Sequence, residues 1–290
     1  MIARGCMLER VILYGLILFI LALNFYPSLE KTNEFLYQNE VAVLVYHHID
    51  DKTQGDVTIS STLLKEQLAN LLHQGYHFIN LKQFQGFLTG TGNIPDNAVL
   101  VTFDDGYESF YKKAYPILHE FHIPAVNFVV THELLNPLAT AIPSLSKDEI
   151  QRMVAEDQNM DFQCHTDHLH QQIEGKALLT TKIMVNGVLE TDQQYEQRIL
   201  NDTQSCIEKL HDLYPVKIDT YAYPYGYFDS KSVALLMHSG IKYAFTTTSG
   251  MVTRKTEFMQ IPRINAGSPF VKAISVNNLI VQTIRSREGS

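Results

Sequence analysis

Two adjacent carboxylates follow one of the most apolar stretches of this 290-residue chain. Residues 99–103 have the aliphatic and aromatic composition of a buried strand, and Asp104, Asp105 and Gly106 come directly after it. Neighbouring aspartates repel each other and lose hydration on burial, unless a cation or hydrogen-bond donors lie beside them. The pair therefore indicates a metal ion, an arginine or a helix N-terminus at this position. An acidic turn that only caps the following helix is the structural alternative.

A cluster of histidines follows a second short apolar stretch, residues 160–164. His165, Asp167, His168 and His170 fall within six residues. A third ligand from Asp105 would leave a coordination position open for water, as hydrolytic metal sites require. A solvated polar loop explains the cluster equally well when it is taken alone. The paired aspartates at another strand end favour metal ligation.

Strands and helices alternate about seven times along the chain, which is typical of a parallel α/β sheet. The count favours a barrel over an open doubly wound sheet. In such barrels the working side chains gather at the carboxyl ends of the strands. We therefore expect one site, formed by residues at these ends that are far apart in sequence. They are His47, Asp104, Asp105, His165 and Tyr225, with Arg263 as a further candidate.

Several local signals fix individual elements. Ser60 or Ser61 is expected to cap one helix, and Ser146 forms a capping box with Glu149 at the start of another. Residues 181–191 predict a hairpin with a type I′ turn at Asn-Gly. A helix over residues 192–213 places one stripe toward the core, formed by Tyr195, Ile199, Cys206, Leu210 and Leu213.

Composition limits the classes of function. The net charge is −8, and the 23 lysines and arginines form no dense run, so nucleic acid is not an expected partner. The chain is long enough to bury its own core, and we expect a monomer. Its three cysteines, Cys6, Cys164 and Cys206, resemble neither a disulfide framework nor a zinc knuckle. A bridge between Cys164 and Cys206 is possible, but we interpret both as separate small buried side chains.

The N-terminus has the pattern of an export signal. Arg4 and Arg10 precede thirteen largely apolar residues, 11–23. We interpret residues 1–28 as a signal peptide or signal anchor, 29–40 as a linker and 41–290 as the catalytic domain. The lack of a clear small-x-small cleavage site favours an uncleaved anchor in contact with the cytoplasmic membrane. Either form places the domain outside that membrane, at the cell surface or secreted. A buried helix of a soluble domain is the alternative.

Three motifs together resemble the polysaccharide deacetylases of the NodB-homology type, carbohydrate esterase family 4. They are Thr-Phe-Asp-Asp-Gly at 102–106, His-Thr-x-x-x-His at 165–170 and Tyr-Pro-Tyr-Gly at 223–226. The five-residue histidine step, and a histidine motif at the start of the domain, resemble the circularly permuted branch. That branch contains exported deacetylases of poly-β-1,6-N-acetyl-D-glucosamine, a biofilm polysaccharide. The resemblance covers residues 41–267. It implies a distorted (β/α)7 barrel, which the N-terminal hydrophobic helix would precede.

The resemblance also implies a metal site. Asp105, His165 and His170 would hold a divalent ion, with zinc expected and cobalt or nickel as alternatives. The acidic residue of the family loop normally sits one position later than Asp167 does here. Asp167 and His168 are therefore expected either to tune the site or to be merely solvated.

Catalytic roles follow from the same resemblance. Asp104 would be the general base, His47 the acid that protonates the departing amine, and the backbone N–H of Tyr225 the donor to the oxyanion. His48 is the alternative to His47, because strand alternation sends the two imidazoles to opposite faces. No arginine motif precedes Tyr221, so Arg263 either orients Asp104 or is an ordinary surface residue. Tyr225, Tyr227 and Phe228 would stack on sugar rings or belong to the core.

The implied activity is metal-dependent hydrolysis of N-acetyl groups from extracellular poly-β-1,6-N-acetyl-D-glucosamine, which gives free amines and acetate in biofilm exopolysaccharide maturation. One alternative is a deacetylase of peptidoglycan, chitin or xylan with the same site. The absence of tryptophan and the permuted order favour the exopolysaccharide branch. The other alternative is a non-catalytic carbohydrate-binding relative, which the complete set of four site residues disfavours.

Overall fold

The computed structural model describes residues 36–53 and 55–288, and Phe35–Ser290 form one compact unit. The expected signal segment at residues 1–28, with its hydrophobic helix, and most of the 29–40 linker lie outside the described residues. Within the described part, none of the helices combines the length and the apolar character needed to cross a bilayer.

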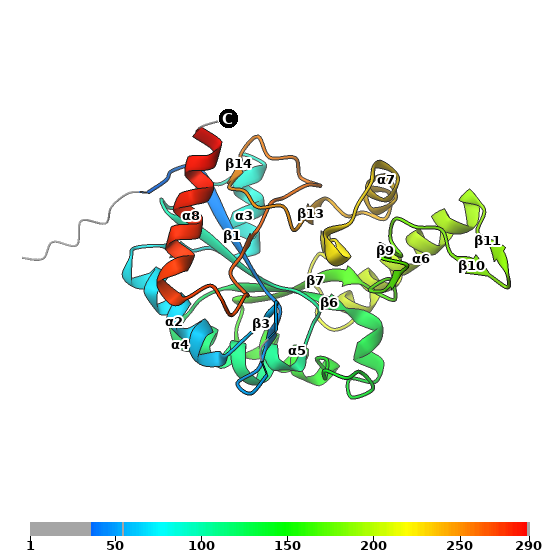
Figure 1. Cartoon of the computed structure of the whole chain (residues 1–290), viewed down its shortest axis with the longest axis horizontal. Coiled ribbons are helices and arrows are strands. Elements are labelled where there is room, and N and C mark those ends of the chain that lie inside the picture. Colours follow the sequence, from blue (N-terminus) through cyan, green and yellow to red (C-terminus); the bar gives the residue numbers. More distant parts are fainter. Residues whose placement is uncertain (1–35, 54, 289–290) are drawn as a thin grey trace, which may run out of the picture. The chain divides into compact units, whose positions relative to one another are not determined.

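A curled, largely parallel sheet organises the fold (Figure 1). Its strands lie in the order β13-β12-β7-β6-β5-β1-β14, with β4 beside β5 and β15 beside β1. β14 pairs antiparallel with β1, and the other pairs are parallel. The bounds are β1 Glu40–Tyr46, β4 His77–Phe78, β5 Ala98–Phe103, β6 Ala125–Val130, β7 Met160–Thr166, β12 Thr220–Ala222, β13 Tyr243–Phe245, β14 Val252–Thr253 and β15 Ile264–Asn265.

One late segment contacts both edges of this curled sheet. The N–H of Ile261 donates to the carbonyl of Ala244 in β13, at 2.9 Å. A few residues later, β15 pairs with β1 and places Ile264 opposite Leu44. The expected parallel α/β sheet is therefore confirmed. The sheet is curled into a half-barrel.

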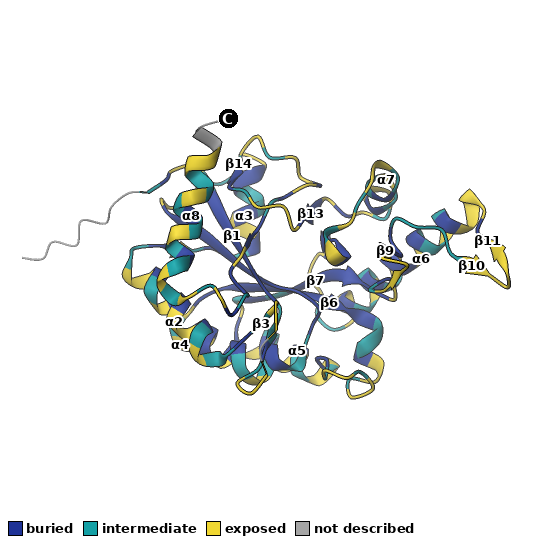
Figure 2. Ribbon diagram, in the orientation of Figure 1, coloured by how far each residue is buried: buried dark blue, intermediate teal, exposed yellow. Residues whose placement is uncertain are grey.

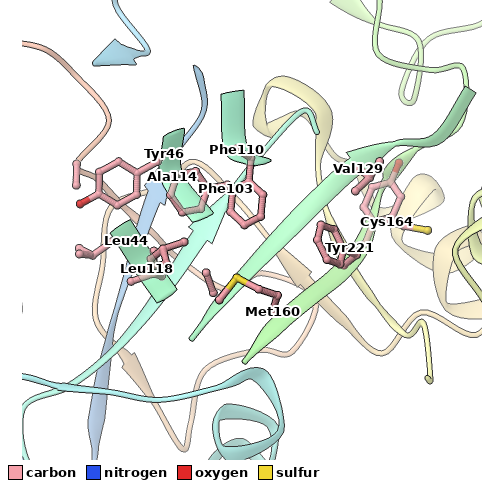
Figure 3. Close-up of a cluster of buried hydrophobic side chains, with 14 of the residues drawn as sticks. Leu44, Tyr46, Phe103, Phe110, Ala114, Leu118, Val129, Met160, Cys164 and Tyr221 are labelled. Atoms are coloured by element: carbon pink, nitrogen blue, oxygen red, sulfur yellow. The ribbon is translucent and has the colours of Figure 1, made fainter. Parts of the chain in front are cut away.

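Strand side chains alternate between two apolar clusters, because successive residues of a strand point to opposite faces. Leu44 and Phe103 lie in the larger cluster, which also contains residues of most of the helices, and Figure 3 shows its centre. Leu100 and Phe128 face the other way and pack with α3. The helices are α2 Ser61–His73, α3 Leu81–Leu88, α4 Tyr115–Phe121, α5 Lys147–Glu156, α6 Asp192–His211, α7 Ser230–His238 and α8 Ala273–Glu288. Each fully buried aliphatic or aromatic side chain contributes about 1.5–3 kcal/mol.

The predicted local signals are largely confirmed. Ser60 caps α2, and Ser146 forms the expected capping box at α5. The hairpin pairs β10 Met184–Val185 with β11 Val188–Leu189. Asn186 and Gly187 between them have φ of 51° and 80°, as a type I′ turn requires. This hairpin projects beside the start of α6 and is exposed on both faces (Figures 1 and 2).

Other elements differ from expectation. The helix that follows the aspartate pair begins with a π-helical stretch, Phe110–Ala114, before α4. The sequence pattern also did not reveal α8, which packs along α2 (Figure 1). The amide of Gln67 on α2 donates to the carbonyls of Ala266 and Val271, so α2 fixes the approach to α8.

Cys164 and Cys206 form a disulfide, so the interpretation as separate buried side chains was wrong. Cys164 lies on β7 and Cys206 on α6, and packing of the helix on the strand brings their Cα atoms to 6.0 Å. That distance is within the usual disulfide range. A sequence separation of 42 residues gives no sign of this proximity. The bridge ties α6 to the strand that also carries His165.

Candidate active site and metal centre

The turn after β5 aims the two aspartates in different directions. Asp105 has φ of 73° and Gly106 has φ of 72°, so two successive residues adopt the left-handed conformation. A Cβ on Gly106 would also lie 3.1 Å from the side chain of Val129, so glycine is required there. A non-glycine residue in this region costs of order 1–3 kcal/mol, which is typical of functional sites. Asp104 consequently faces one set of partners and Asp105 another.

Asp105 meets two imidazoles. Its Oδ1 lies 3.3 Å from His165 Nε2 and 3.2 Å from His170 Nε2. Two ligand atoms at tetrahedral angles around one zinc ion are about 3.3 Å apart, so these residues fit a shared ion. Burial alone would raise the pKa of Asp105, but hydrogen bonds from the two imidazoles outweigh it and hold that pKa well below its usual range. Asp105 is therefore ionised, as a metal ligand would have to be.

A backbone contact fixes the orientation of His165. Its Nδ1 lies 2.7 Å from the carbonyl oxygen of Ala222, at the end of β12. Because a carbonyl only accepts, Nδ1 donates its proton to Ala222, and Nε2 is left as the ring atom that faces Asp105 and is available to a metal ion. This arrangement is the usual support for a metal-binding imidazole.

Asp104 is held by Arg263. The guanidinium makes two parallel hydrogen bonds of 2.7 Å to the two carboxylate oxygens, and a third of 2.9 Å to the carbonyl of Thr246. Arg263 is 1% exposed, so the interpretation as an ordinary surface arginine was wrong. Burial would raise the pKa of Asp104, but the positive charge and hydrogen bonds of Arg263 outweigh the effect of burial and lower that pKa. Asp104 is thus an ionised carboxylate in one fixed orientation.

The structure separates the two candidate acid histidines. His47 places its Nε2 3.9 Å from Asp104 Oδ2. His48 points to the other face, where its Nδ1 lies 2.9 Å from the hydroxyl of Ser109. Strand alternation predicted this separation, and the geometry brings His47 to the aspartate pair and takes His48 away from it.

Tyr225 lies against His170 at the rim. Their rings stack with centroids 4.7 Å apart, and the tyrosine hydroxyl donates to the carbonyl of His170 at 3.3 Å. Tyr225 has φ of 58°, and the next residue, Gly226, has φ of 74°. A Cβ on Gly226 would lie 2.0 Å from Thr247 Oγ1, so only glycine allows this turn. Tyr225 remains 41% exposed.

The other two aromatic residues after β12 separate. Tyr227 is 48% exposed, so it remains available at the rim. Phe228 stacks on buried Tyr223, with ring centroids 4.7 Å apart. Of the two alternatives for Phe228, its contacts favour the core.

Helix α6 holds residues 164–170, the segment that carries His165 and His170. We call it the histidine segment. Asp202 accepts hydrogen bonds from the hydroxyl of Thr166 and from the N–H groups of Asp167 and His168, at 2.6–3.0 Å. The disulfide to Cys206 holds the start of the same segment.

Asp167 belongs to this support, and neither its side chain nor that of His168 faces Asp105. Both oxygens of Asp167 accept from the ammonium of Lys209, at 2.7 and 2.9 Å, and Ser205 adds a further bond. His168 Nδ1 lies 2.8 Å from the same carboxylate. Asp167, His168 and Asp202 are close enough to resemble a second ligand group, but Lys209 already supplies the positive charge there. We call Asp202, Ser205, Cys206 and Lys209 together the α6 anchor.

The sequence analysis missed the α6 anchor apart from Cys206. A signal was nevertheless present, because Asp202 stands three residues after Ile199 and four before Cys206. An acid in the core-facing stripe of an amphipathic helix must have buried partners. Its partners were not identifiable from the pattern.

Comparison with known sequences decides the family. The sequence model described as polysaccharide deacetylase matches residues 91–244. The chain belongs to the polysaccharide deacetylase family. The match includes the aspartate pair and the histidine segment. It does not include His47 or Arg263.

Two curated relatives carry the name poly-β-1,6-N-acetyl-D-glucosamine N-deacetylase. The protein of Escherichia coli K12 is 27% identical over 266 residues, which are 84% of this chain and 39% of the relative. The protein of Staphylococcus epidermidis RP62A is 27% identical over 250 residues, 81% of this chain and 82% of the relative. The chain therefore spans well under half of the longer E. coli protein.

Solved structures of this family share the fold. The de-N-acetylase from Aggregatibacter actinomycetemcomitans has a TM-score of 0.72 at 23% identity and covers 83% of this chain and 99% of its own. IcaB from Ammonifex degensii has a TM-score of 0.71 at 25% identity and covers 83% and 97%.

Proposed function

We propose that this polysaccharide deacetylase hydrolyses N-acetyl groups of poly-β-1,6-N-acetyl-D-glucosamine, using a divalent metal ion, and so contributes to maturation of a biofilm exopolysaccharide. The reaction adds water across the amide bond and yields acetate and a free amine on the polymer. The names of the curated relatives support this substrate. Zinc is the expected ion, because two imidazoles and a carboxylate suit it.

One observation carries the proposal. Asp104 and Asp105 are neighbours in sequence, yet Arg263 takes both oxygens of Asp104 while Asp105 meets two imidazoles. A site that only bound metal would gain from a second carboxylate ligand. A hydrolase needs one carboxylate kept off the metal to accept a proton.

The residues then divide the work. Asp105, His165 and His170 would hold the ion. When bound, a divalent ion supplies Lewis acidity, which polarises a carbonyl and makes water more acidic. Asp104 accepts the proton of the attacking water, and Arg263 keeps its carboxylate aimed at that position.

Two further groups act on the amide. The backbone N–H of Tyr225 donates to the oxygen of the acetyl carbonyl as negative charge develops there. His47 protonates the amine nitrogen while the C–N bond breaks, which is required because an unprotonated amine leaves poorly. His47 Nε2 lies 3.9 Å from Asp104 Oδ2, which supports an acid and a base that act on the same amide group.

The proposed location is the outer face of the cytoplasmic membrane, or the space beyond it. The charged and apolar pattern of residues 1–28 supports export or membrane anchoring. The disulfide between Cys164 and Cys206 agrees with an oxidising compartment. The proposed partner is therefore an extracellular N-acetylglucosamine polymer.

Acetate release tests the proposal. The purified chain should release acetate from β-1,6-linked N-acetylglucosamine oligomers faster than from β-1,4-linked oligomers or peptidoglycan. A chelator should abolish this activity, and added zinc or cobalt should restore it. Faster release from a β-1,4-linked substrate would contradict the proposed substrate, and full activity after chelation would contradict the metal.

Two histidines of one segment make a matched pair of variants. His170→Ala should lose both bound metal and activity, because its imidazole faces Asp105. His168→Ala removes a neighbouring imidazole that faces Asp167, and should keep both. Equal metal content in the two variants would refute the ligand assignment.

A further inference from the structure

The end of β6 lies between the two segments that carry the proposed metal ligands. One edge of β6 pairs with β5, which ends at the aspartate pair, and the other edge pairs with β7, which carries His165. We call residues 104–108, after β5, the aspartate turn. A Cβ on Gly106 of this turn would lie 3.1 Å from the side chain of Val129, so the turn rests directly on β6. The last residues of β6 are therefore placed to act on both segments.

The pairing of β6 with β7 is interrupted at one of the proposed ligands. Val129 lies opposite Cys164 (Figure 3), and the next residue, Val130, lies opposite Thr166. His165 therefore has no opposite residue in β6 and is the extra residue of a β-bulge. A bulge bends its strand and redirects the side chain. The direction of the His165 imidazole thus depends on how the two strands are held just beyond this point.

Directly after β6, the short helical turn Thr131–Leu135 holds the histidine segment. The hydroxyl of Thr131 donates to a carboxylate oxygen of Asp167 at 2.6 Å. The Nδ1 of His132 lies 2.6 Å from the backbone carbonyl oxygen of Asp167, and it is the donor because a carbonyl only accepts. Thr131 and Asp167 are buried, so water competes little for the bond between them.

The next residue of this turn, Glu133, is bonded to the opposite side. Its carboxylate accepts a hydrogen bond from the hydroxyl of Ser144, which is buried. Tyr107 and Ser144 pair as an antiparallel bridge. Beside them, the N–H of Leu145 donates to the carbonyl of Gly106 at 2.7 Å. Glu133 is therefore linked, through Ser144, to the aspartate turn.

We call Thr131, His132 and Glu133 the β6 clamp, because these three consecutive residues join the histidine segment to the aspartate turn. From these contacts we propose that the β6 clamp sets the spacing between Asp105 and the two histidine ligands, and thereby the affinity of the site for its ion. Metal ligands have to lie within about 0.2 Å of their ideal distances. The inference rests on the metal site of the proposed function. The clamp residues are positioning residues, since they act through their neighbours.

Two serines of one loop give a matched pair of variants. Ser144→Ala removes the link to Glu133 and leaves the backbone bonds to the aspartate turn in place. It should weaken zinc binding by about tenfold, measured by competition with a chelating dye. Ser146→Ala removes the cap that Ser146 forms with Glu149 at the start of α5. It should lower the unfolding temperature of the metal-free chain by about 2–4 °C and leave zinc affinity unchanged.

The matched pair separates positioning from general stability. If zinc affinity only followed stability, Ser146→Ala would weaken zinc binding at least as much as Ser144→Ala. If the wild type binds zinc and the two variants bind it equally well, the β6 clamp is wrong and the proposed function stands. If the wild type binds no zinc, the metal site of the proposed function fails, and this inference fails with it.

Cutting the other end of the clamp tests whether it works as one link. Thr131→Val combined with His132→Phe removes both donors to Asp167. The phenyl ring can keep the stacking contact that His132 makes with His168. This double variant should also bind zinc about tenfold more weakly. Because the two ends act in series, adding Ser144→Ala should cause little further loss. A further tenfold loss would reveal two independent supports and contradict the clamp.

Discussion

The two sides of the candidate metal site, formed by Asp105, His165 and His170, are held in different ways. On the side of β7, the histidine segment is fixed by the α6 anchor through a disulfide and several buried hydrogen bonds. On the side of β1, the segment after His47 borders a cavity lined in part by His48, Ile49 and Lys112, and the charged side chains there form partly exposed ion pairs, such as that of Lys112 with Glu108. Surface ion pairs of this kind contribute about 0–1 kcal/mol each.

This difference matches what each side has to do. Metal ligands must keep their spacing to within a fraction of an ångström, which requires rotamers fixed by buried partners. A surface that accepts successive units of a long polymer must instead stay open. Rigidity is therefore concentrated behind the proposed ligands His165 and His170.

The largest expected effect concerns Asp104, which lies between the two sides. Asp104→Asn removes the proton acceptor and should lower kcat by about 10²–10⁴-fold while metal content stays close to one ion per chain. Metal analysis and acetate release on the same sample check this. Loss of the ion along with activity would mean that Asp104 is a ligand.

Asp104→Asn also leaves the buried Arg263 without its carboxylate. Thermal unfolding therefore has to accompany the kinetics, because breaking a buried ion pair costs about 3–5 kcal/mol. Activity is compared only at temperatures where both proteins are folded. An unchanged unfolding temperature would contradict the buried pairing of Asp104 with Arg263.

Removing the disulfide tests the rigid side directly. The double variant Cys164→Ala, Cys206→Ala should lose about 2–5 kcal/mol of unfolding free energy, since the unfolded chain is no longer cross-linked. Denaturant unfolding of the oxidised wild type and the variant measures it. The two proteins should be equally stable if the cysteines are not bridged.

A smaller effect is expected from Asp202. Asp202→Ala removes three hydrogen bonds to the histidine segment and should weaken zinc binding by about 10–100-fold, measured by competition with a chelating dye. Arg198→Ala is the matched control on the same helix, because it breaks bonds to Glu190 and leaves the histidine segment untouched. Equal zinc affinity in both variants would refute the positioning role of Asp202.

The smallest expected effect is a pH dependence of stability. It comes from the control pair, Arg198 with Glu190. Hydrogen bonds from Arg198 hold the pKa of Glu190 below its usual range, although burial opposes them. A depressed folded-state pKa stabilises the fold above the ordinary glutamate pKa and is lost as pH falls through the folded value. Wild type should exceed Arg198→Ala by about 1–2 kcal/mol at pH 7, with the difference shrinking below about pH 4. A constant difference would exclude the ionised pair.

Much of the site was predictable because its residues follow strands of clear composition. The meeting of the aspartate pair with His165 and His170, and the facing of His47, follow from strand ends and alternation. The sequence left two alternatives for the role of Arg263, because its partner Asp104 lies 159 positions away in the chain. The disulfide and Asp202 depend on how α6 packs on β7, and no local pattern encodes that packing. The missed α8 shows the same limit, because its burial depends on α2.

The most direct test locates the metal ion. A crystal of the zinc-loaded protein, measured at the zinc absorption edge, should give one strong anomalous peak about 2.0–2.2 Å from Asp105, His165 and His170. Asp104 should stay paired with Arg263 and outside bonding distance of that peak. A peak bonded to Asp104, or one at Asp167 and Asp202 in its place, would contradict the account.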